Sequence, residues 1–392
     1  MAKKIVHIIT RMILGGAQEN TLLSCEGLNR SPEWDVTLLT GPAIGPEGEL
    51  IRRARKSGIR TVVIPEMRRA ISPWRDSVSL GKILEYLRVK EPDIVHTHSS
   101  KAGVLGRLAA HFARVPVVIH TIHGLPFHPY ENVFSNAVYI AAEKLGAACC
   151  GRIACVADAM AEQALAAGVG SESQFATIHS GMEVDAFLEA GSRRHTIRER
   201  YGFTEDDVVI GKIARLFHLK GHKYVLQAAP EIVHECPEAK FMFVGDGILR
   251  SHLESMARDL GVADRVVFTG LVDSAEIPDM ISAMDMLIHA SLREGLPRAV
   301  VQALLEARPV VCYDVDGAPE VVIDGETGRL VPPESVQELA EAVTELIKIP
   351  EKARTMAENA RGRFADQFRA ETMVHELEKL YRNELSRAGG FA

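Results

Sequence analysis

Two basic residues, Arg215 and Lys220, stand five residues apart in the segment ARLFHLKGHK, directly after an apolar run that is typical of a buried strand. Arg binds two oxygens at once through its planar guanidinium, whereas Lys acts as a compact point charge. Such a pair on a loop between a strand and a helix is suited to a diphosphate, because ligands of parallel sheets bind beyond the carboxyl ends of the strands. The alternative is that both are solvated surface charges, as most Lys and Arg side chains are.

A second group of polar residues lies in the segment HASLREGLPRAVVQALLEARPVV. Glu294, Gly295 and Leu296 follow an apolar run, and Pro297 fits the first position of the next helix, where the backbone N–H groups are free to bind an anion. Gln302 comes eight residues after Glu294, about two helical turns away, so both side chains can address one ligand. The pattern favours a sugar-phosphate site in which the carboxylate accepts sugar hydroxyls. The alternative is that Glu294 only caps the helix, since acidic groups are favoured there.

Two pairs of glycines also follow predicted strands. Gly15 and Gly16 precede a helical pattern, where glycine lets a phosphate approach free N–H groups, and a simple turn is the equal alternative. Gly245 and Gly247, in FVGDGILR, match two-thirds of a dinucleotide-binding fingerprint, but Arg250 replaces the third glycine and no acidic residue ends the next strand. NAD is therefore not expected. No Gly-x(4)-Gly-Lys-[Ser/Thr] sequence is present, which excludes a P-loop ATPase at the level of motifs.

Four histidines cluster around two neighbouring predicted strands. His96 and His98 share one face of a strand, while His120 and His123 lie near the end of the next. No third ligand with fixed geometry is evident, and no carboxylate or thiolate accompanies these histidines, so we expect no metal site. His123 precedes Gly124 at a strand-end turn, where it is either a hydrogen-bonding residue that faces a ligand or a structural histidine.

Length and composition bound the class of protein. The 392 residues exceed the roughly 250–300 at which one hydrophobic core stops growing, so two domains are expected. The composition is globular, and the net charge of −7 makes the chain a poor candidate for a general nucleic-acid binder. Charged residues interrupt the longest apolar stretch, 133–157, so no segment is predicted to span a bilayer. The cysteines are too sparse for a disulfide scaffold, and we predict a cytoplasmic protein with reduced thiols at Cys25, Cys149, Cys150, Cys155, Cys236 and Cys312.

Short, continuously apolar runs alternate with longer amphipathic segments along the chain. This pattern predicts parallel strands covered by helices on both faces. Strands are expected at 5–10, 34–40, 61–64, 93–98, 115–122 and 153–156, and after a polar stretch at 208–214, 240–244, 266–269, 286–289 and 310–313. The fold class is therefore α/β, with two doubly wound Rossmann-like domains that face each other across a cleft. The expected boundaries are a first domain over 1–187, a linker over 188–206 and a second domain over 207–370.

Taken together, these segments resemble the retaining, nucleotide-sugar-dependent glycosyltransferases of family four, which have the two-domain GT-B architecture. The resemblance covers about residues 3–375. It is carried, in family order, by GGAQENTLL, HTHSSKAGVLGRLAA, TIHG, IHSGMEVDAF, GKIARLFHLKG, FVGDG, VVFTG, REGLPRAVVQALLEARPVV and APEVVIDGETGRLVPP. It implies that the terminal segment, 371–392, is a helix that crosses back to the first domain, which would bind the acceptor.

The resemblance also implies roles for single residues. His123 lies by the donor sugar, Arg215 and Lys220 hold the diphosphate and stabilise it as the leaving group, and Glu294 binds sugar hydroxyls. Further residues line the diphosphate, base or ribose: Gly15, Gly16, Gly245, Leu271, Val272, Gly295, Leu296, Pro297, Arg298 and Gln302. Gln302 departs from the family pattern, which has a second glutamate there. Its amide oxygen can still accept a hydrogen bond from a ribose hydroxyl.

The reaction expected from this resemblance is hexose transfer with retention, from a nucleotide-diphosphate sugar to a glycan or lipid-linked acceptor, in cell-surface polysaccharide synthesis. No convincing carboxylate partner for Glu294 is found, so a front-face path is expected, without metal or cofactor. The alternatives are a sugar-nucleotide epimerase and a non-catalytic nucleotide-sugar-binding protein. A basic cluster is either a solvated helix face or a peripheral contact with the inner face of a membrane: Arg52, Arg53, Arg55, Lys56, Arg60, Arg68 and Arg69.

Overall fold

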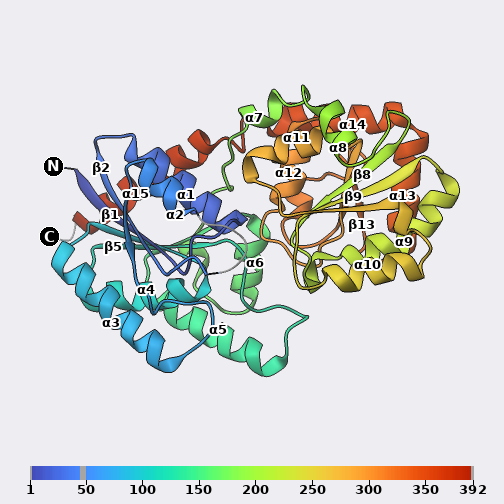
Figure 1. The fold of residues 1–392 in the computed structure, drawn as a ribbon. Helices are drawn as coiled ribbons and strands as arrows, with labels where there is room; N and C mark the ends of the chain where they lie inside the picture. Colours follow the sequence, from blue (N-terminus) through green and yellow to red (C-terminus); the bar gives the residue numbers. More distant parts are fainter. Residues whose placement is uncertain (1, 45–49, 390–392) are drawn as a thin grey trace. The chain divides into compact units, whose positions relative to one another are not determined.

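The computed structural model describes residues 2–44 and 50–389 of the chain (Figure 1). They fall into two compact units. Unit 1 comprises the chain up to Met182 together with the segment from Arg369 onward, and unit 2 comprises Glu183–Phe368. Each unit is an open, fully parallel sheet with helices on both faces. The doubly wound α/β fold class predicted from the continuous apolar runs is confirmed.

Unit 1 contains a seven-stranded sheet of order β3-β2-β1-β4-β5-β6-β7. Its strands are β1 (Lys3–Ile9), β2 (Trp34–Thr40), β3 (Arg60–Val63), β4 (Ile94–His98), β5 (Val117–Ile122), β6 (Arg152–Cys155) and β7 (Phe175–Thr177). The last of these was not predicted, because it is only three residues long and half-buried. The strand order reverses between β1 and β4, and such a switch point opens a crevice beyond the carboxyl ends of the strands.

Helices cover both faces of the unit 1 sheet. Figure 1 shows one layer on one face and a second layer, with the terminal helix, on the other. The first layer contains α3 (Pro73–Lys90), α4 (Ser100–Ala113) and α5 (Val133–Ala148), and the second contains α1 (Gly16–Asn29) and α15 (Ala370–Gly389). The shorter helices are α2 (Ile51–Lys56) and α6 (Asp158–Ala166). The terminal helix α15 is held to the sheet by Tyr381, which is fully buried and whose hydroxyl lies 2.5 Å from His96 Nδ1.

Unit 2 contains a six-stranded sheet of order β10-β9-β8-β11-β12-β13, with its switch point between β8 and β11. The strands are β8 (Val208–Ile213), β9 (Ala239–Val244), β10 (Val266–Gly270), β11 (Met286–His289), β12 (Val310–Tyr313) and β13 (Arg329–Val331). The main helices are α9 (His222–Glu235), α10 (Arg250–Asp259), α11 (Ile277–Ser282), α12 (Arg298–Leu305), α13 (Val336–Lys348) and α14 (Pro350–Phe364). Buried side chains from α9, α13 and the strands form one continuous core.

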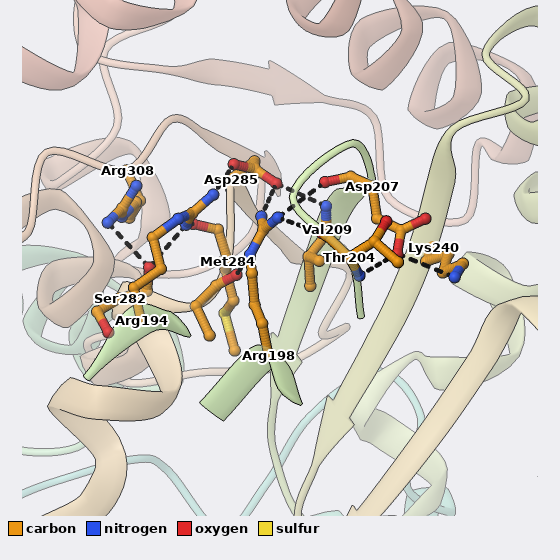
Figure 2. Close-up of polar contacts among 11 residues, drawn as sticks. Arg194, Arg198, Thr204, Asp207, Val209, Lys240, Ser282, Met284, Asp285 and Arg308 are labelled. Atoms are coloured by element: carbon orange, nitrogen blue, oxygen red, sulfur yellow. Dashed lines mark hydrogen bonds and ion pairs between the residues drawn. The ribbon is translucent and has the colours of Figure 1, made fainter. Parts of the chain in front are cut away.

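The segment expected to be a linker, 188–206, folds instead as part of unit 2. It contains α8 (Arg194–Arg200), and the short α7 (Asp185–Leu188) precedes it. Arg194 and Arg198 both contact the carboxylate of Asp285, at 2.5 and 2.6 Å, and Asp285 also accepts the N–H of Val209 at 2.7 Å (Figure 2). The charges that made the segment look like a solvated linker are thus neutralised, and the side chain of Arg198 is buried.

Candidate functional site

A cluster of charged side chains lies at the carboxyl edge of the unit 2 sheet, at its switch point. Arg215 comes two residues after β8, and Lys220 ends the short 3₁₀ turn His218–Lys220 before α9. Glu294 comes five residues after β11, the strand beside β8. The Leu292 N–H donates to the carbonyl of Leu219 at 2.9 Å, so the two loops are tied together.

Lys220 and Glu294 form an ion pair at the centre of this cluster. The Lys220 Nζ lies 2.6 Å from Glu294 Oε1, and His289 Nε2 lies 3.1 Å from the same oxygen. The backbone N–H of Glu294 donates to Asp316 Oδ2 at 2.7 Å, which fixes the loop. The two predicted site residues are therefore brought together, and the structure adds His289 and Asp316, which the sequence did not single out.

The electrostatics of this cluster keep the carboxylate ionised. Burial would raise the pKa of Glu294, but the Lys220 ammonium and the His289 imidazole outweigh it and hold that pKa well below its usual range. The pKa of His289 itself is lowered, because burial outweighs the attraction of Glu294. At neutral pH the cluster is thus an ionised Lys–Glu pair with a neutral imidazole that donates to the carboxylate.

A buried amine, Lys212, lies on β8 in the strand that leads to Arg215. Its side chain is fully buried, and its Nζ has no hydrogen-bond partner among the residues that the structure describes. Burial, reinforced by the charge of Lys220, lowers the pKa of Lys212 to about 7. The sequence analysis missed this residue, because a lysine inside an apolar run reads as a solvated strand residue.

The glycines after the strands of unit 2 serve the packing of these loops. Gly221 has φ +70°, and a Cβ there would lie 1.6 Å from the carbonyl oxygen of Ala290 in the β11 loop. A Cβ on Gly245 or Gly247 would lie 2.3 or 2.5 Å from backbone oxygens that flank Arg215. Gly245-x-Gly247 does not open a helix directly, because α10 begins only at Arg250. Close backbone approach accounts for these glycines without a ligand.

The remaining predicted residues of unit 2 lie along its loops and α12. Pro297 is the residue before α12 rather than its first residue, because its ψ of 86° is not helical, and the helix begins at Arg298. Gly295 and Leu296 are buried in the same loop, and Gln302 is half-buried within the helix. Leu271 and Val272 follow the edge strand β10, and Leu271 is 52% exposed.

In unit 1, the predicted site residues lie beyond the carboxyl ends of two strands, β1 and β5. Gly15 precedes α1 and Gly16 is its first residue, in the loop after β1. A Cβ on Gly15 would meet only the side chain of Gln18, so no backbone contact requires glycine there. His123 directly follows β5, and its Nε2 lies 3.1 Å from His98 Nδ1.

The other histidines of unit 1 separate into distinct environments. His120 hydrogen-bonds Thr97 on β4, and His96 hydrogen-bonds both Tyr381 and Thr121. The sequence suggested no third metal ligand beside His96 and His98, but the structure brings one, His7 on β1. The nitrogens of these three buried side chains lie within 4.8 Å of one another. The position of His7 follows from the order of the strands, which the sequence does not state.

Comparison with known proteins places the two units in one enzyme family. Residues 15–181 match the model of the glycosyl transferase 4-like domain, and residues 193–363 match the model of glycosyl transferases group 1. The chain belongs to the group 1 glycosyltransferases. This glycosyltransferase is 27% identical over 383 residues, 96% of each chain, to a UDP-Gal:alpha-D-GlcNAc-diphosphoundecaprenol alpha-1,3-galactosyltransferase of Escherichia coli. It is 35% identical over 198 residues, half of each chain, to an alpha-D-kanosaminyltransferase of Streptomyces kanamyceticus.

Solved structures agree on the fold. HepE of Anabaena, solved with UDP and glucose, superposes on this glycosyltransferase with a TM-score of 0.83 and 22% identity, over 97% of this chain and all of that one. The resemblance to family four and the GT-B fold class predicted from the sequence are confirmed. No helix in the described part of the chain is long and apolar enough to cross a membrane.

Proposed function

We propose that this glycosyltransferase transfers a hexose, with retention, from a nucleoside-diphosphate sugar to a glycan or lipid-linked acceptor in cell-surface polysaccharide synthesis. The observation that carries the proposal is the Lys220–Glu294 ion pair at the switch point of unit 2, with Arg215 on the same loop as Lys220. The E. coli relative bears the name of an enzyme that glycosylates a diphosphoundecaprenol-linked sugar, and HepE was solved with UDP and glucose. The name of the E. coli enzyme and the ligands of HepE both favour a nucleotide-sugar donor.

In the proposed reaction, the cations of unit 2 stabilise the leaving group. The bond between the anomeric carbon and the diphosphate breaks, and the oxygen of the acceptor hydroxyl bonds that carbon from the same face. The hydroxyl proton passes to an oxygen of the departing phosphate. Arg215 and Lys220 neutralise the charge that develops on the diphosphate, and no metal or cofactor is needed for this step.

Glu294 has two roles in this proposal. Before the donor binds, its carboxylate compensates the charge of Lys220. When the diphosphate pairs with the Lys220 ammonium, Glu294 keeps its contact with His289 Nε2 and accepts hydrogen bonds from sugar hydroxyls. We propose that Gln302 accepts a ribose hydroxyl through its amide, and that His123 of unit 1 contacts the donor sugar.

A peripheral membrane contact by the basic cluster of unit 1 belongs to the same proposal. Arg53 forms an ion pair with Glu26 at 2.8 Å, whereas the other members of the cluster are exposed: Arg52, Arg55, Lys56, Arg60, Arg68 and Arg69. We therefore expect the exposed members to carry any attraction to anionic lipid. Liposome flotation with these six residues changed to Gln tests this: lost binding supports the contact, and binding equal to that of the wild type refutes it.

The experiment that tests the function is incubation of the purified chain with labelled UDP-glucose, UDP-galactose and GDP-mannose, with and without an undecaprenyl diphosphate-linked sugar. The proposal predicts label in the lipid fraction only when acceptor is present, with an α-linkage by NMR from an α-linked donor. A β-linkage contradicts retention. Conversion of the donor to another sugar nucleotide without acceptor identifies an epimerase, and donor binding without turnover identifies a non-catalytic binding protein.

A further inference from the structure

Three histidines of unit 1 form a continuous hydrogen-bonded row at the carboxyl ends of its central strands. His7 Nδ1 lies 2.9 Å from His98 Nε2, and His98 Nδ1 lies 3.1 Å from His123 Nε2. They come from β1, from β4 and from the residue after β5, which are neighbours in the sheet. His7 and His98 are fully buried, and His123 is half-buried. The row therefore runs from the interior of the unit to the carboxyl edge of its sheet.

The two inner rings are neutral. Burial lowers the pKa of His7 to about 3. Burial, with the neighbouring histidines adding to it, lowers the pKa of His98 well below its usual value. Each of these imidazoles carries one hydrogen, on one of its two nitrogens.

This count leaves two arrangements when His123 is neutral as well. If His98 donates from Nδ1 to His123, its Nε2 must accept from Nδ1 of His7, and every ring carries its hydrogen on Nδ1. If His98 donates from Nε2 to His7, every ring carries its hydrogen on Nε2. The tautomer of His123 therefore depends on the tautomers of His98 and His7.

The inner end of the row favours one arrangement. His7 Nε2 is buried and has no hydrogen-bond partner within the described residues. In the Nε2–H arrangement this atom would be a buried donor without an acceptor, which is rare in folded proteins. In the Nδ1–H arrangement it is only an unfilled acceptor. The buried Nε2 of His7 therefore determines the direction in which the hydrogen bonds of the row are donated.

We propose that His98 and His7 are positioning residues that hold His123 in its Nδ1–H tautomer, so that His123 donates a hydrogen bond from Nδ1 to an oxygen of the donor sugar nucleotide. The last step rests on the proposed function, whereas the tautomer is a property of the folded chain alone. The row explains why two buried histidines stand behind a third at the edge of the sheet.

A metal site is the competing explanation of the same residues, because the nitrogens of His7, His96 and His98 lie close enough to share an ion. The hydrogen bonds oppose it. Both nitrogens of His96 are already engaged, Nδ1 with the Tyr381 hydroxyl at 2.5 Å and Nε2 with the Thr121 hydroxyl at 2.6 Å. A metal would have to break one of these bonds and also one of the two hydrogen bonds of His98.

The direct test is histidine ¹⁵N NMR on the full chain, in which long-range couplings report the tautomer of each ring. The proposal predicts Nδ1–H for His7, His98 and His123 near pH 7.5. Any ring in the Nε2–H form, or an imidazolium at His98, overturns it. So does a joint shift of the His7, His96 and His98 signals when one equivalent of Zn²⁺ is added. This test needs no substrate, so it stands even if no donor is turned over.

Variants of His98 test the link to catalysis. His98→Phe removes the donor to His123, whereas His98→Gln keeps an amide N–H that can replace it. We expect kcat to fall about 10-fold in His98→Phe, the size of one lost hydrogen bond, with KM nearly unchanged and largely restored kcat in His98→Gln. His120→Phe, a buried histidine outside the row, is the control for structural damage. Equal losses in all three variants, or an unchanged His123 tautomer in His98→Phe, overturn the proposal.

Discussion

The carboxyl edges of the two sheets are built on the same plan but carry different chemistry. In unit 2, the switch point between β8 and β11 holds an ionised pair, Lys220 and Glu294. In unit 1, the switch point between β1 and β4 holds the row of His7, His98 and His123, in which His7 and His98 are neutral. The ion pair of unit 2 can neutralise the charge of a diphosphate, whereas the neutral rings of His7 and His98 can only donate and accept hydrogen bonds.

The difference follows from whether groups of opposite charge contact the buried side chains at each edge. Glu294 retains its charge although it is largely buried, because Lys220 and His289 contact it directly. No carboxylate contacts the rings of His7 or His98 in the described residues, so burial keeps them neutral. We infer that unit 2 supplies charge stabilisation and that unit 1 supplies positioning.

The largest effect should come from removing the cations of unit 2. We expect Arg215→Ala and Lys220→Ala each to lower kcat at saturating donor by about 10²–10³, the usual loss for one preorganised donor to a developing charge. Lys223→Ala removes an exposed lysine three residues from Lys220 and serves as the matched control. Steady-state kinetics at saturating donor measures these losses in kcat. A Lys220→Ala variant with the kcat of the wild type would show that the charged residues at this edge of unit 2 are not catalytic.

Glu294→Gln tests the carboxylate of the same edge. We expect kcat/KM to fall roughly 10- to 100-fold, because hydrogen bonds to a charged acceptor are worth about 1.5–3 kcal/mol. The stability contributed by the lowered pKa of Glu294 is present above the unfolded pKa near 4.5 and is lost as the pH falls below it. Thermal melts from pH 3 to 7 should therefore show a shallower acid limb in the variant. An unchanged acid limb would contradict the ion-pair account.

Lys212→Met tests the comparison of the two units in another way. It removes from unit 2 a buried amine that has no hydrogen-bond partner among the described residues. The pKa of Lys212 is about 7 when folded and 10.5 when unfolded, so the unfolded chain binds more protons between these values and stability rises with pH there. Below about pH 7 the cost of burying the charge is present in full. We expect the variant to be more stable at pH 7, by roughly 1–4 kcal/mol, and to lose the rise toward pH 10 in denaturant titrations. A destabilised variant would show that the ammonium has a partner in solution.

Gln302→Glu should have the smallest effect. A carboxylate accepts a ribose hydroxyl more strongly than an amide by about 1 kcal/mol, so we expect KM for the nucleotide sugar to fall roughly five-fold with kcat unchanged. Gln337→Glu, on the exposed face of α13, makes the same charge change away from the edge. A rise in KM for Gln302→Glu alone would mean that this side chain meets a phosphate rather than a ribose.

The sequence predicted the strands of four or more residues and the loops that follow them, because continuous apolar runs identify buried parallel strands. It did not predict the three-residue strands β7 and β13. It also identified Lys220 and Glu294, but it could not predict their contact, which depends on β8 and β11 being neighbours. His7 and His289 were missed for the same reason, since a histidine inside an apolar run has no visible partner until the strand order is known. The linker was misplaced because the charge of Arg198 is neutralised by a distant residue, Asp285.

The most direct measurement is a crystal structure of the protein with bound UDP. The account predicts that the diphosphate oxygens lie within hydrogen-bonding distance of the Lys220 ammonium and the Arg215 guanidinium, with the Lys220–Glu294 contact lengthened from 2.6 Å. A diphosphate bound away from the β8 and β11 loops, with that ion pair intact, would contradict it.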